Sequence, residues 1–543
     1  MARRFANRFA HARPAHDPAY RREAPPDGLF GFGQHAPAAA KFGLLLLCAV
    51  WILAGLIGRV PWRGSDGDVF VDLLAAWAGG QLALPPLYFW VASATAWLSS
   101  PVLALHDGAR LASGVFVALA LWFTARAARV SDGEDAGWPA ALVLLGSVGL
   151  LVRAHELNPY TGSFAAAALV LYALARVPHS PQGAVWLAGG LFLLTLAGGA
   201  AEAAVLSLLV LILPALSPVW RDVRVLRAAW LGAAGGWVLT SGWLAALQAS
   251  GGDVAAALQT ARWAGPLNAE FPSILGWFAW PAWPLAAWAL YYGRRRWQET
   301  GLLLPLASLL VLLALYSFMT DPGEAKGLIL LLPLALLGGG GLLTLRRGAA
   351  NALFWFSLML FGLMALVFWV YWVAHDFGTP ARLANRLGRL GLDAVGTFRP
   401  WTLLLGTTLT VAWIVFMTRV RRSPLRPILV WTAGMTFVWS LLMALFLQPL
   451  DRRLGFETLA RDIDRQVPAG ACIETYAVRP QAGALLAYHS GRDFRPADAG
   501  CRWLIVQVRQ KGALPAVTDE WVMRAKIARP NNRDERFVLF ARR

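Results

Sequence analysis

Charged side chains are scarce in this sequence. Of its 543 residues, 57% are hydrophobic and only 15% are charged, whereas soluble domains carry roughly 25% charged residues. This shortage excludes an ordinary soluble protein and indicates a chain that crosses a membrane many times. The formal net charge is +18. Because the arginines mostly flank apolar runs, we attribute this charge to membrane topology and not to nucleic-acid binding.

The sequence also lacks the short motifs of nucleotide and metal enzymes. It contains no P-loop, no GxGxxG after a strand, and neither HExxH nor CxxC. An enzyme built from this chain would therefore work without a bound nucleotide or a structural zinc ion. The chemistry that remains is carried by acidic and basic groups on the segments between apolar runs.

Cysteine is rare as well, with three residues in the whole chain. Cys48 lies inside the first apolar run, where it would serve as inert packing. Cys472 and Cys501 lie in the polar C-terminal region, each at the start of a strand-like run. If that region is outside the cytoplasm, the two residues can form a disulfide; the alternative is two free buried thiols.

Long apolar runs dominate the middle of the chain. Residues 1–40 are rich in Arg, Pro and Ala and predict a disordered basic tail. The first span follows at 41–58, since a spanning helix needs about 20 apolar residues. The further predicted spans are 109–130, 137–153, 161–177, 182–198, 200–217, 226–248, 273–293, 301–319, 327–345, 351–374, 400–418 and 427–448. The predicted fold class is therefore an all-α polytopic membrane domain, 41–448, with about 13 transmembrane helices.

Charges alternate between the two ends of the predicted spans. Arginine clusters mark one set of ends, at 126–129, 221–227, 294–296, 346–347 and 419–422. The positive-inside rule assigns these ends and the basic tail to the cytoplasm. An odd number of spans then places the C-terminus outside, which is the periplasm in a Gram-negative bacterium. We therefore predict a multi-pass protein of the bacterial inner membrane.

The outer C-terminal region, 449–543, combines helical and strand-like patterns. One helix is predicted over 456–467 and a second over 481–489, ending near Gly491. Strand-like runs occupy 472–478, 502–508, 521–527 and 536–541. This region is predicted to be a small periplasmic α/β domain.

One outer loop, 374–399, breaks the charge rule. Arg382, Arg386 and Arg389 recur at helical spacing, and a leucine follows each of them by one position. This pattern predicts an amphipathic helix lying at the membrane interface. The arginines either anchor to lipid headgroups or clamp the phosphate of a lipid-linked substrate.

The first outer loop, 59–108, carries a cluster of carboxylates beside a span. Asp66 and Asp68 stand in WRGSDGDVF, where Gly64 and Gly67 predict a loop. Such a pair can hold a divalent cation, or one carboxylate can take a proton from an attacking hydroxyl. The alternative is loop solvation together with capping of the helix that follows Asp68.

Other outer loops add charged groups. The segment RAHELNPY, 153–160, brings Arg153, His155 and Glu156 to the end of the third span; the alternative is an interfacial anchor with an internal Arg–Glu pair. Arg262 precedes the outer loop 263–272, and Lys326 opens a span after DPGEA. A lysine at the top of a helix is also a common interfacial anchor.

The order of these features resembles the bacterial polytopic glycosyltransferases of the C superfold, above all the aminoarabinose transferases of lipid A and the protein O-mannosyltransferases. The resemblance covers about residues 41–448 and depends on PWRGSDGDVF, PPLYFW, HDGARLASG, RAHELNPY, WFAWPAWPLAAWAL and DPGEAKGLILLLPLALL. The C-terminal part also resembles the outer domain of a proteobacterial subgroup, including Cys472 and the run CRWLIVQ.

This resemblance implies transfer of a sugar from a polyprenyl phosphate to a lipid, glycan or protein acceptor on the periplasmic face, as in lipid A modification of the cell envelope. An acid of the first outer loop would deprotonate or orient the acceptor. We assign this role to Asp66 and Asp68, with binding of a divalent cation as the other role open to the pair. The expected substrate contacts are Arg63, Arg153, His155, Glu156, Tyr160, Arg262, Lys326, Arg382 and Arg386.

The chain departs from the family at several positions. An Asp-Glu pair and a later Glu-Lys-Pro-Pro are usual in the first loop, whereas this chain has RGSDGD at 63–68 and Ala-Leu-Pro-Pro at 83–86. Tyr160 stands where the family tends to have an Asp. These losses keep open a catalytically degenerate homologue that binds a lipid-linked sugar or a partner protein. A secondary transporter is less favoured, since Glu202 is the one acid predicted within a span.

Overall fold

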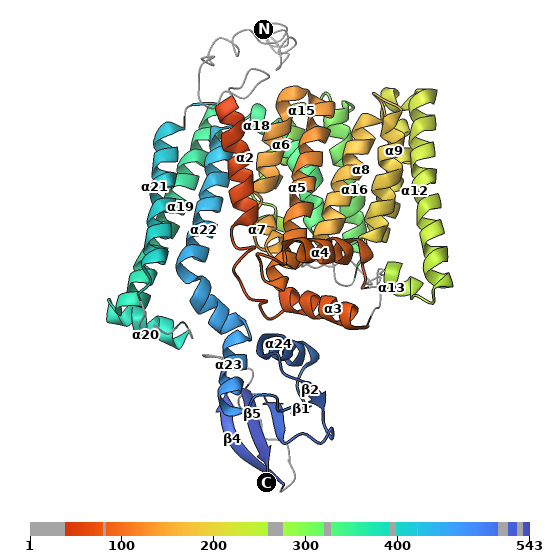
Figure 1. Ribbon diagram of the computed structural model, residues 1–543. Coiled ribbons are helices and arrows are strands. Elements are labelled where there is room, and N and C mark those ends of the chain that lie inside the picture. Colours follow the sequence, from red (N-terminus) through yellow and green to blue (C-terminus); the bar gives the residue numbers. More distant parts are fainter. Residues whose placement is uncertain are drawn as a thin grey trace.

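The computed structural model of this chain describes residues 38–79, 83–258, 275–319, 327–390, 392, 398–420, 422–508, 520–528 and 536–543. Figure 1 shows long helices side by side in a bundle, with α2 starting at one end and the C-terminal sheet lying beyond the other. Most described residues are helical, and the strands are confined to the C-terminal part.

Helices make up most of the described residues in the region where spans are predicted. In chain order they are α2 (Ala38–Leu53), α3 (Ser65–Gly79), α4 (Pro86–Ser99), α5 (Leu105–Asp132), α6 (Gly137–Leu145), α7 (Val148–Ala154), α8 (Tyr160–Arg176), α9 (Gln182–Leu196), α10 (Ala200–Ser207), α11 (Leu209–Leu216), α12 (Val223–Ala249), α13 (Val254–Leu258), α15 (Ala282–Gly293), α16 (Thr300–Ser317), α18 (Leu331–Leu343), α19 (Arg347–Phe377), α20 (Ala381–Arg389), α21 (Pro400–Arg419) and α22 (Arg426–Leu454). Short 3-10 helices are η2 (Glu134–Ala136), η3 (Pro218–Arg221) and η4 (Gly327–Leu330).

Several helices have the length and composition of membrane spans. Within the described residues, five meet both criteria, namely α5, α16, α19, α21 and α22. Shorter apolar helices cover 40–53, 182–196, 200–216 and 327–343. The predicted polytopic, mainly helical fold class is confirmed at this level, while the full number of spans stays a prediction.

Glycines interrupt two apolar runs that the hydropathy pattern treats as continuous. The predicted span 137–153 is split between α6 and α7, because Gly146 ends α6 and its carbonyl oxygen accepts the Trp431 indole N–H at 2.7 Å. The run 182–217 is interrupted at Gly198, whose φ of +83° is open to glycine and strained for other residues. Side-chain hydropathy does not report such backbone requirements.

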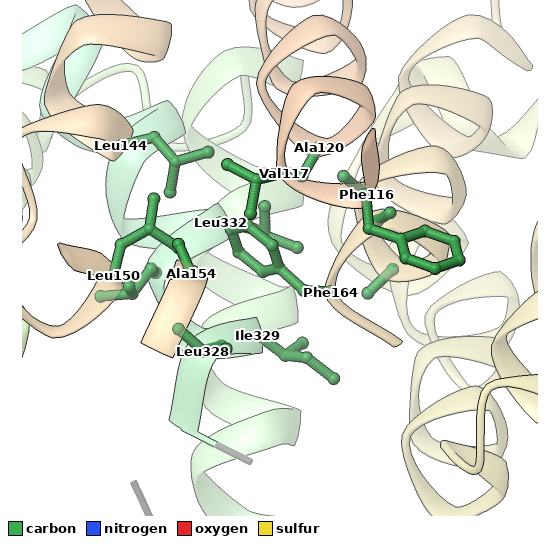
Figure 2. Packing of buried hydrophobic residues seen from close by; sticks show 14 of the residues in the cluster. Phe116, Val117, Ala120, Leu144, Leu150, Ala154, Phe164, Leu328, Ile329 and Leu332 are labelled. Carbon is green, nitrogen blue, oxygen red and sulfur yellow. The ribbon is translucent and has the colours of Figure 1, made fainter. Parts of the chain in front are cut away.

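The core of the bundle joins helices that are distant in sequence. Figure 2 shows Phe116 and Val117 of α5, Leu144 of α6, Phe164 of α8 and Leu332 of α18 gathered in one cluster. All five side chains are buried. Because lipid tails are as apolar as these side chains, such a cluster stabilises the bundle through close van der Waals packing more than through exclusion of water.

The first outer loop is largely helical, and the loop predicted at 62–70 is therefore corrected. Helix α3 begins at Ser65 and places Asp66 and Asp68 in its first turn, where the helix dipole favours carboxylates. Of the two glycines, Gly64 alone has a positive φ, +96°, and it ends the preceding turn, while Gly67 is helical. Helices α3 and α4 lie across the bundle on the side of the C-terminal domain (Figure 1).

The C-terminal part is a small mixed sheet with two helices. Its elements are α23 (Glu457–Gln466), β1 (Ile473–Tyr476), α24 (Pro480–Ser490), β2 (Phe494–Pro496), β3 (Trp503–Val508), β4 (Trp521–Ile527) and β5 (Arg536–Arg542). The strand order is β2-β1-β3-β5-β4, with β1 parallel to β2 and β3, and β5 antiparallel to β3 and β4. As predicted, α24 ends at Gly491, which has φ +64°. Helix α22 continues past residue 449, where we placed the domain boundary, and leads directly into this domain.

A disulfide links the starts of two neighbouring strands, since Cys472 precedes β1 and Cys501 precedes β3. The two residues are 29 positions apart, a loop for which chain-entropy arguments give about 3–4 kcal/mol of stabilisation. In the Cys472→Ser/Cys501→Ser variant, which lacks this stabilisation, we expect the amide hydrogens of β1 and β3 to exchange faster than in wild type. Cys48→Ser, which lies outside this domain, is the control. Exchange at the wild-type rate in the double variant would contradict the expectation.

Candidate active site

A buried ion pair anchors the first turn of α3 to α5. Arg110 is 0% exposed and donates from Nε and Nη2 to the two carboxylate oxygens of Asp66, at 3.2 and 3.1 Å. Its Nη1 donates to Asp107 and to the carbonyl oxygens of Leu56 and Arg59. A buried guanidinium needs such partners, because an unpaired charge is costly away from water. Arg110 therefore ties α5 to α3 and to the segment that follows α2.

Asp66 is surrounded by donors on every side. Besides Arg110, its oxygens receive the backbone N–H groups of Leu157 at 2.8 Å and Trp62 at 3.1 Å, and Arg59 Nη2 lies 3.4 Å away. Burial would raise the pKa of Asp66, but Arg110 and Arg59 outweigh it and lower the pKa to about 2. A carboxylate with so low a pKa is a weak proton acceptor at neutral pH. Its contacts are those of an anchor for α3.

Arg59 and its neighbours extend this anchor to other helix ends. Arg59 is 1% exposed, donates to the carbonyl oxygen of His155 at 2.7 Å, and stacks its guanidinium 4.1 Å from the centre of the Trp62 ring. The Trp62 indole donates to Asp451 of α22 at 2.7 Å. The Gly58 N–H is bound by the Asp107 carboxylate at 2.8 Å. The start of the first outer segment is thus fixed to α5, α7 and α22.

Asp68 lies on the other side of the same helical turn and is exposed. Residues two apart on an α-helix point about 200° apart, which separates this carboxylate from Asp66. Asp72, one turn later, is exposed on the same face as Asp68. Partial burial and the charge of Asp72 raise the pKa of Asp68, while Arg479, just before α24, opposes this rise. Asp68 is therefore an accessible carboxylate with increased proton affinity.

A third carboxylate, that of Glu156, reaches the start of α3 from the segment between α7 and α8. Its Oε2 accepts the Ser65 hydroxyl at 3.0 Å and faces Arg153 Nη1 at 3.3 Å. The side chain is 17% exposed, so it is within reach of the outside. Burial raises the pKa of Glu156, and Arg153 offsets part of that rise. The predicted Arg–Glu pair is present, and it lies directly against the first residue of α3.

A chain of hydroxyl groups positions the backbone beside Glu156. The Ser113 hydroxyl donates to the Glu156 carbonyl oxygen at 2.6 Å, and the Tyr88 hydroxyl lies 2.9 Å from Ser113 Oγ. Tyr88 in turn accepts the Asn158 N–H at 3.0 Å. The Asn158 side chain then accepts the N–H of Tyr160, the first residue of α8, at 3.1 Å. Helices α4, α5 and α8 therefore hold the segment that carries Glu156.

The C-terminal domain packs directly on α3 through α24. Gln481 Nε2 donates to the carbonyl oxygen of Gly64 at 2.9 Å. Tyr488 stacks edge-on against Phe70, with ring centres 4.9 Å apart, and its hydroxyl lies 2.9 Å from His106 Nδ1. Gly67 permits this approach, because a Cβ there would lie 2.7 Å from Gln481 Nε2. Residues remote in sequence thus fix the position of α3 relative to the bundle.

The structure does not bring the proposed cation ligands together. Asp66 and Asp68 point away from each other, and both oxygens of Asp66 are occupied by donors. Among the residues that the structure describes, no group of three or more His, Cys, Asp or Glu side chains could hold a metal ion. The donor set at this site therefore does not fit a divalent cation.

The remaining predicted contacts fall into different places. His155 is 0% exposed and turns its ring nitrogens to the carbonyl oxygens of Leu151 and Trp51, so it supports the site from within. Burial lowers its pKa to about 4, which keeps it neutral at pH 7. Arg63, just before α3, is exposed, and Tyr160, the first residue of α8, is half-buried.

Two of the four remaining predicted contacts lie away from this cluster. Arg382 and Arg386 lie on α20, which packs on α19 and is separated from α3 and α4 by α22 (Figure 1). Arg262 and Lys326 lie outside the described residues.

Sequence reasoning missed the two arginines that hold the site, Arg59 and Arg110. A usable signal was present, because an arginine within the apolar run 109–130 requires a buried counter-charge. Glu202 is likewise placed differently from the prediction. It lies in the first turn of α10 at the end of the bundle, is buried, and accepts the Tyr316 hydroxyl at 3.0 Å. An acid at a helix end is not the midplane site expected of a transporter.

Comparison with known proteins gives matches among solved structures, whereas no family model and no curated protein matches this chain. ArnT from Cupriavidus metallidurans in the apo state has a TM-score of 0.65 and 16% identity, and the match covers 92% of this chain and 98% of that chain. ArnT bound to undecaprenyl phosphate has a TM-score of 0.63 and 16% identity, with 93% and 98% covered.

These matches include both the helical bundle and most of the C-terminal part, because they extend over nearly the full length of both chains. The low identity agrees with the departures from the family motifs noted in the first outer loop. The protein therefore has the fold of the ArnT structures.

Proposed function

We propose that this protein is a glycosyltransferase that moves a sugar from a polyprenyl phosphate to a lipid, glycan or protein acceptor on the membrane face that carries the C-terminal domain. One observation carries the proposal. Two carboxylates that can accept a proton, those of Asp68 and Glu156, flank the start of a helix that the Asp66–Arg110 pair holds in place. The match to ArnT bound to undecaprenyl phosphate supports the choice of donor.

In the proposed reaction, an acceptor hydroxyl attacks the anomeric carbon of the sugar and gives its proton to Asp68 or Glu156. The bond between that carbon and the phosphate oxygen breaks, and polyprenyl phosphate leaves. Because the acceptor attacks from the side opposite the leaving group, the sugar carbon is inverted. Asp66 positions α3 and takes no proton. Arg63, Arg153 and Tyr160 are proposed to contact the substrates, together with Arg262 and Lys326.

The two candidate proton acceptors can be tested by single substitutions. In proteoliposomes with a polyprenyl-phosphate sugar and an extract of envelope acceptors, we expect one of the two single variants, Asp68→Asn or Glu156→Gln, to lower turnover about 10²–10⁴-fold, the usual contribution of a general base. Asp462→Asn, an exposed carboxylate on α23, is the matched control and should retain turnover. Normal turnover in the Asp68→Asn/Glu156→Gln double variant would remove this mechanism.

The same experiment has an expected pH dependence. The pKa values of Asp68 and Glu156 are both raised above those of ordinary carboxyls. A general base works only when deprotonated, so the rate should fall as the pH drops through the raised pKa of the active residue. This fall in rate at low pH should disappear in the variant that lacks the base and persist in the other variant. The comparison therefore identifies which residue is the base.

A second candidate function is a catalytically degenerate homologue that binds a lipid-linked sugar or a partner protein. The observation that favours it is the full engagement of Asp66, one of the two predicted catalytic acids, by Arg110, Leu157 and Trp62. Retention of polyprenyl phosphate without transfer to any acceptor by the wild-type protein would support this candidate.

Placement in the inner membrane, with the N-terminus in the cytoplasm and the C-terminal domain in the periplasm, is part of the proposal. The arginine clusters at the ends opposite the C-terminal domain support this orientation. The disulfide between Cys472 and Cys501 also suits an oxidising compartment.

A further inference from the structure

Helix α20 presents a row of arginines to the outside. Arg382, Arg386 and Arg389 are exposed, whereas Leu387 is 3% exposed and Leu383 is half-buried. Positions three and four apart lie one above the other on a helix, about 5–6 Å between neighbouring Cβ atoms. The leucine side of α20 therefore packs on α19, and the adjoining side, about 100° around the helix axis, forms a continuous cationic face, which we call the α20 arginine face.

No described acidic side chain neutralises the α20 arginine face. Between residues 347 and 420, the one carboxylate within the described residues is Asp376, and it lies 2.6 Å from His375 Nδ1. Arg399, before α21, is exposed and adds a fourth positive charge at the same end of the helices. Arginines on this end oppose the positive-inside bias that the other loops follow. Their positive charge is thus left available for an anionic partner.

Aromatic side chains place α20 at the level of the lipid headgroups. The rings of Phe377 and Phe398 are 5.5 Å apart and lie on the two segments that flank α20, and Trp401 in the first turn of α21 is 78% exposed. Tryptophan side chains gather at membrane–water interfaces. Helix α21 has Gly406 as its only buried residue, so this corner of the bundle faces lipid. Figure 1 shows α20 lying across the ends of α19 and α21.

We propose that the α20 arginine face is a binding site for the phosphate headgroups of anionic membrane lipids. Guanidinium groups pair with phosphate through two parallel N–H donors, and a row of them at headgroup depth matches a charged lipid surface. Bulk lipid is favoured over the donor of the proposed reaction because α22 separates α20 from α3 and α4 (Figure 1). The site holds the α19–α21 corner in the membrane plane and is independent of the proposed transfer.

The test compares lipid compositions with the full chain in nanodiscs. Hydrogen exchange of the amides of 381–390 is measured in phosphatidylcholine alone and with phosphatidylglycerol added. Since each arginine near an anionic surface contributes about 1 kcal/mol, we expect exchange to slow roughly tenfold or more with phosphatidylglycerol. The Arg382→Gln/Arg386→Gln/Arg389→Gln variant should lose this dependence while keeping the wild-type unfolding temperature.

A matched triple substitution separates this site from general charge attraction. Arg294→Gln/Arg295→Gln/Arg296→Gln removes three exposed arginines from the opposite end of the bundle and should leave the lipid dependence of 381–390 intact. Equal exchange of these amides in both lipids, or persistence of the dependence in the α20 variant, would overturn the proposal. Protection that requires polyprenyl phosphate instead would assign the face to substrate and overturn it as well.

Discussion

Asp66→Asn is expected to destabilise the folded protein by more than any other single substitution in the first outer segment. The substitution removes the carboxylate that pairs with Arg59, which is 1% exposed, and leaves Arg110, which is 0% exposed, with Asp107 as its remaining bonded carboxylate. Removing one partner of a buried ion pair typically costs about 3–5 kcal/mol. The unfolding temperature in detergent should fall on the order of 5 °C or more, and less folded protein should reach the membrane.

Asp68→Asn is the matched control for this effect, since it makes the same chemical change two residues later on an exposed side chain. Its effect on stability should stay within about 0.5 kcal/mol, whether or not Asp68 proves to be the base that turnover requires. Asp66→Glu keeps the negative charge, so the stability of this variant should lie between those of Asp66→Asn and Asp68→Asn. An Asp66→Asn protein with the unfolding temperature of wild type would refute the anchoring role of the pair.

The stabilisation from Asp66 also has a defined pH window. Its folded pKa, about 2, is lower than that of an unfolded aspartate. The contribution is therefore complete above the unfolded value of about 4 and is lost as the pH falls toward 2. Between about pH 4 and about pH 2, the wild-type protein should thus lose more stability than the Asp66→Asn variant.

Gly341→Ala is expected to separate two helices of the bundle. A Cβ at Gly341 would lie 2.2 Å from the carbonyl oxygen of Leu285 and 3.2 Å from the Ala289 Cβ, both on α15. The first contact is with backbone, so α15 or α18 must move as a whole. Small residues allow such close approach between membrane helices, and overpacking of this kind costs about 1–3 kcal/mol or more. Thermal unfolding in detergent measures the loss.

The adjacent Gly340 gives the control for this prediction. A Cβ at Gly340 would meet no atom within 4 Å, so Gly340→Ala should only improve helix propensity, by up to about 1 kcal/mol. The same substitution is therefore expected to lower the stability at Gly341 and to raise it at Gly340. Equal effects would show that the tight α15–α18 contact is absent from the folded protein.

Helix positions in the membrane part follow from the sequence because hydropathy is a local property. The runs predicted at 109–130, 301–319 and 400–418 correspond to α5, α16 and α21 within a few residues. The errors come from backbone effects that composition does not reveal. Gly146 and Gly198 end helices inside apolar runs, and α3 is helical where two glycines suggested a loop.

Assignments within the candidate site were harder to predict, because each depends on partners far away in the chain. The carboxylate of Asp66 is bound by Arg110, 44 positions later, and by the N–H of Leu157, 91 positions later. The hydroxyl of Ser65 reaches Glu156 over the same separation of 91 residues. Nothing in WRGSDGDVF itself distinguishes a buried Asp66 from an exposed Asp68.

The sequence by itself determined that this protein is a mainly helical membrane protein with a small C-terminal sheet domain, because apolar length, arginine placement and strand alternation are each written in consecutive residues. Only the tertiary structure decided which carboxylates remain available for chemistry. Burial and the approach of Arg59 and Arg110 fix the charge on Asp66, whereas Asp68 and Glu156 stay accessible at the start of α3. Electrostatic environment is a property of neighbours in space, and the fold alone supplies those neighbours.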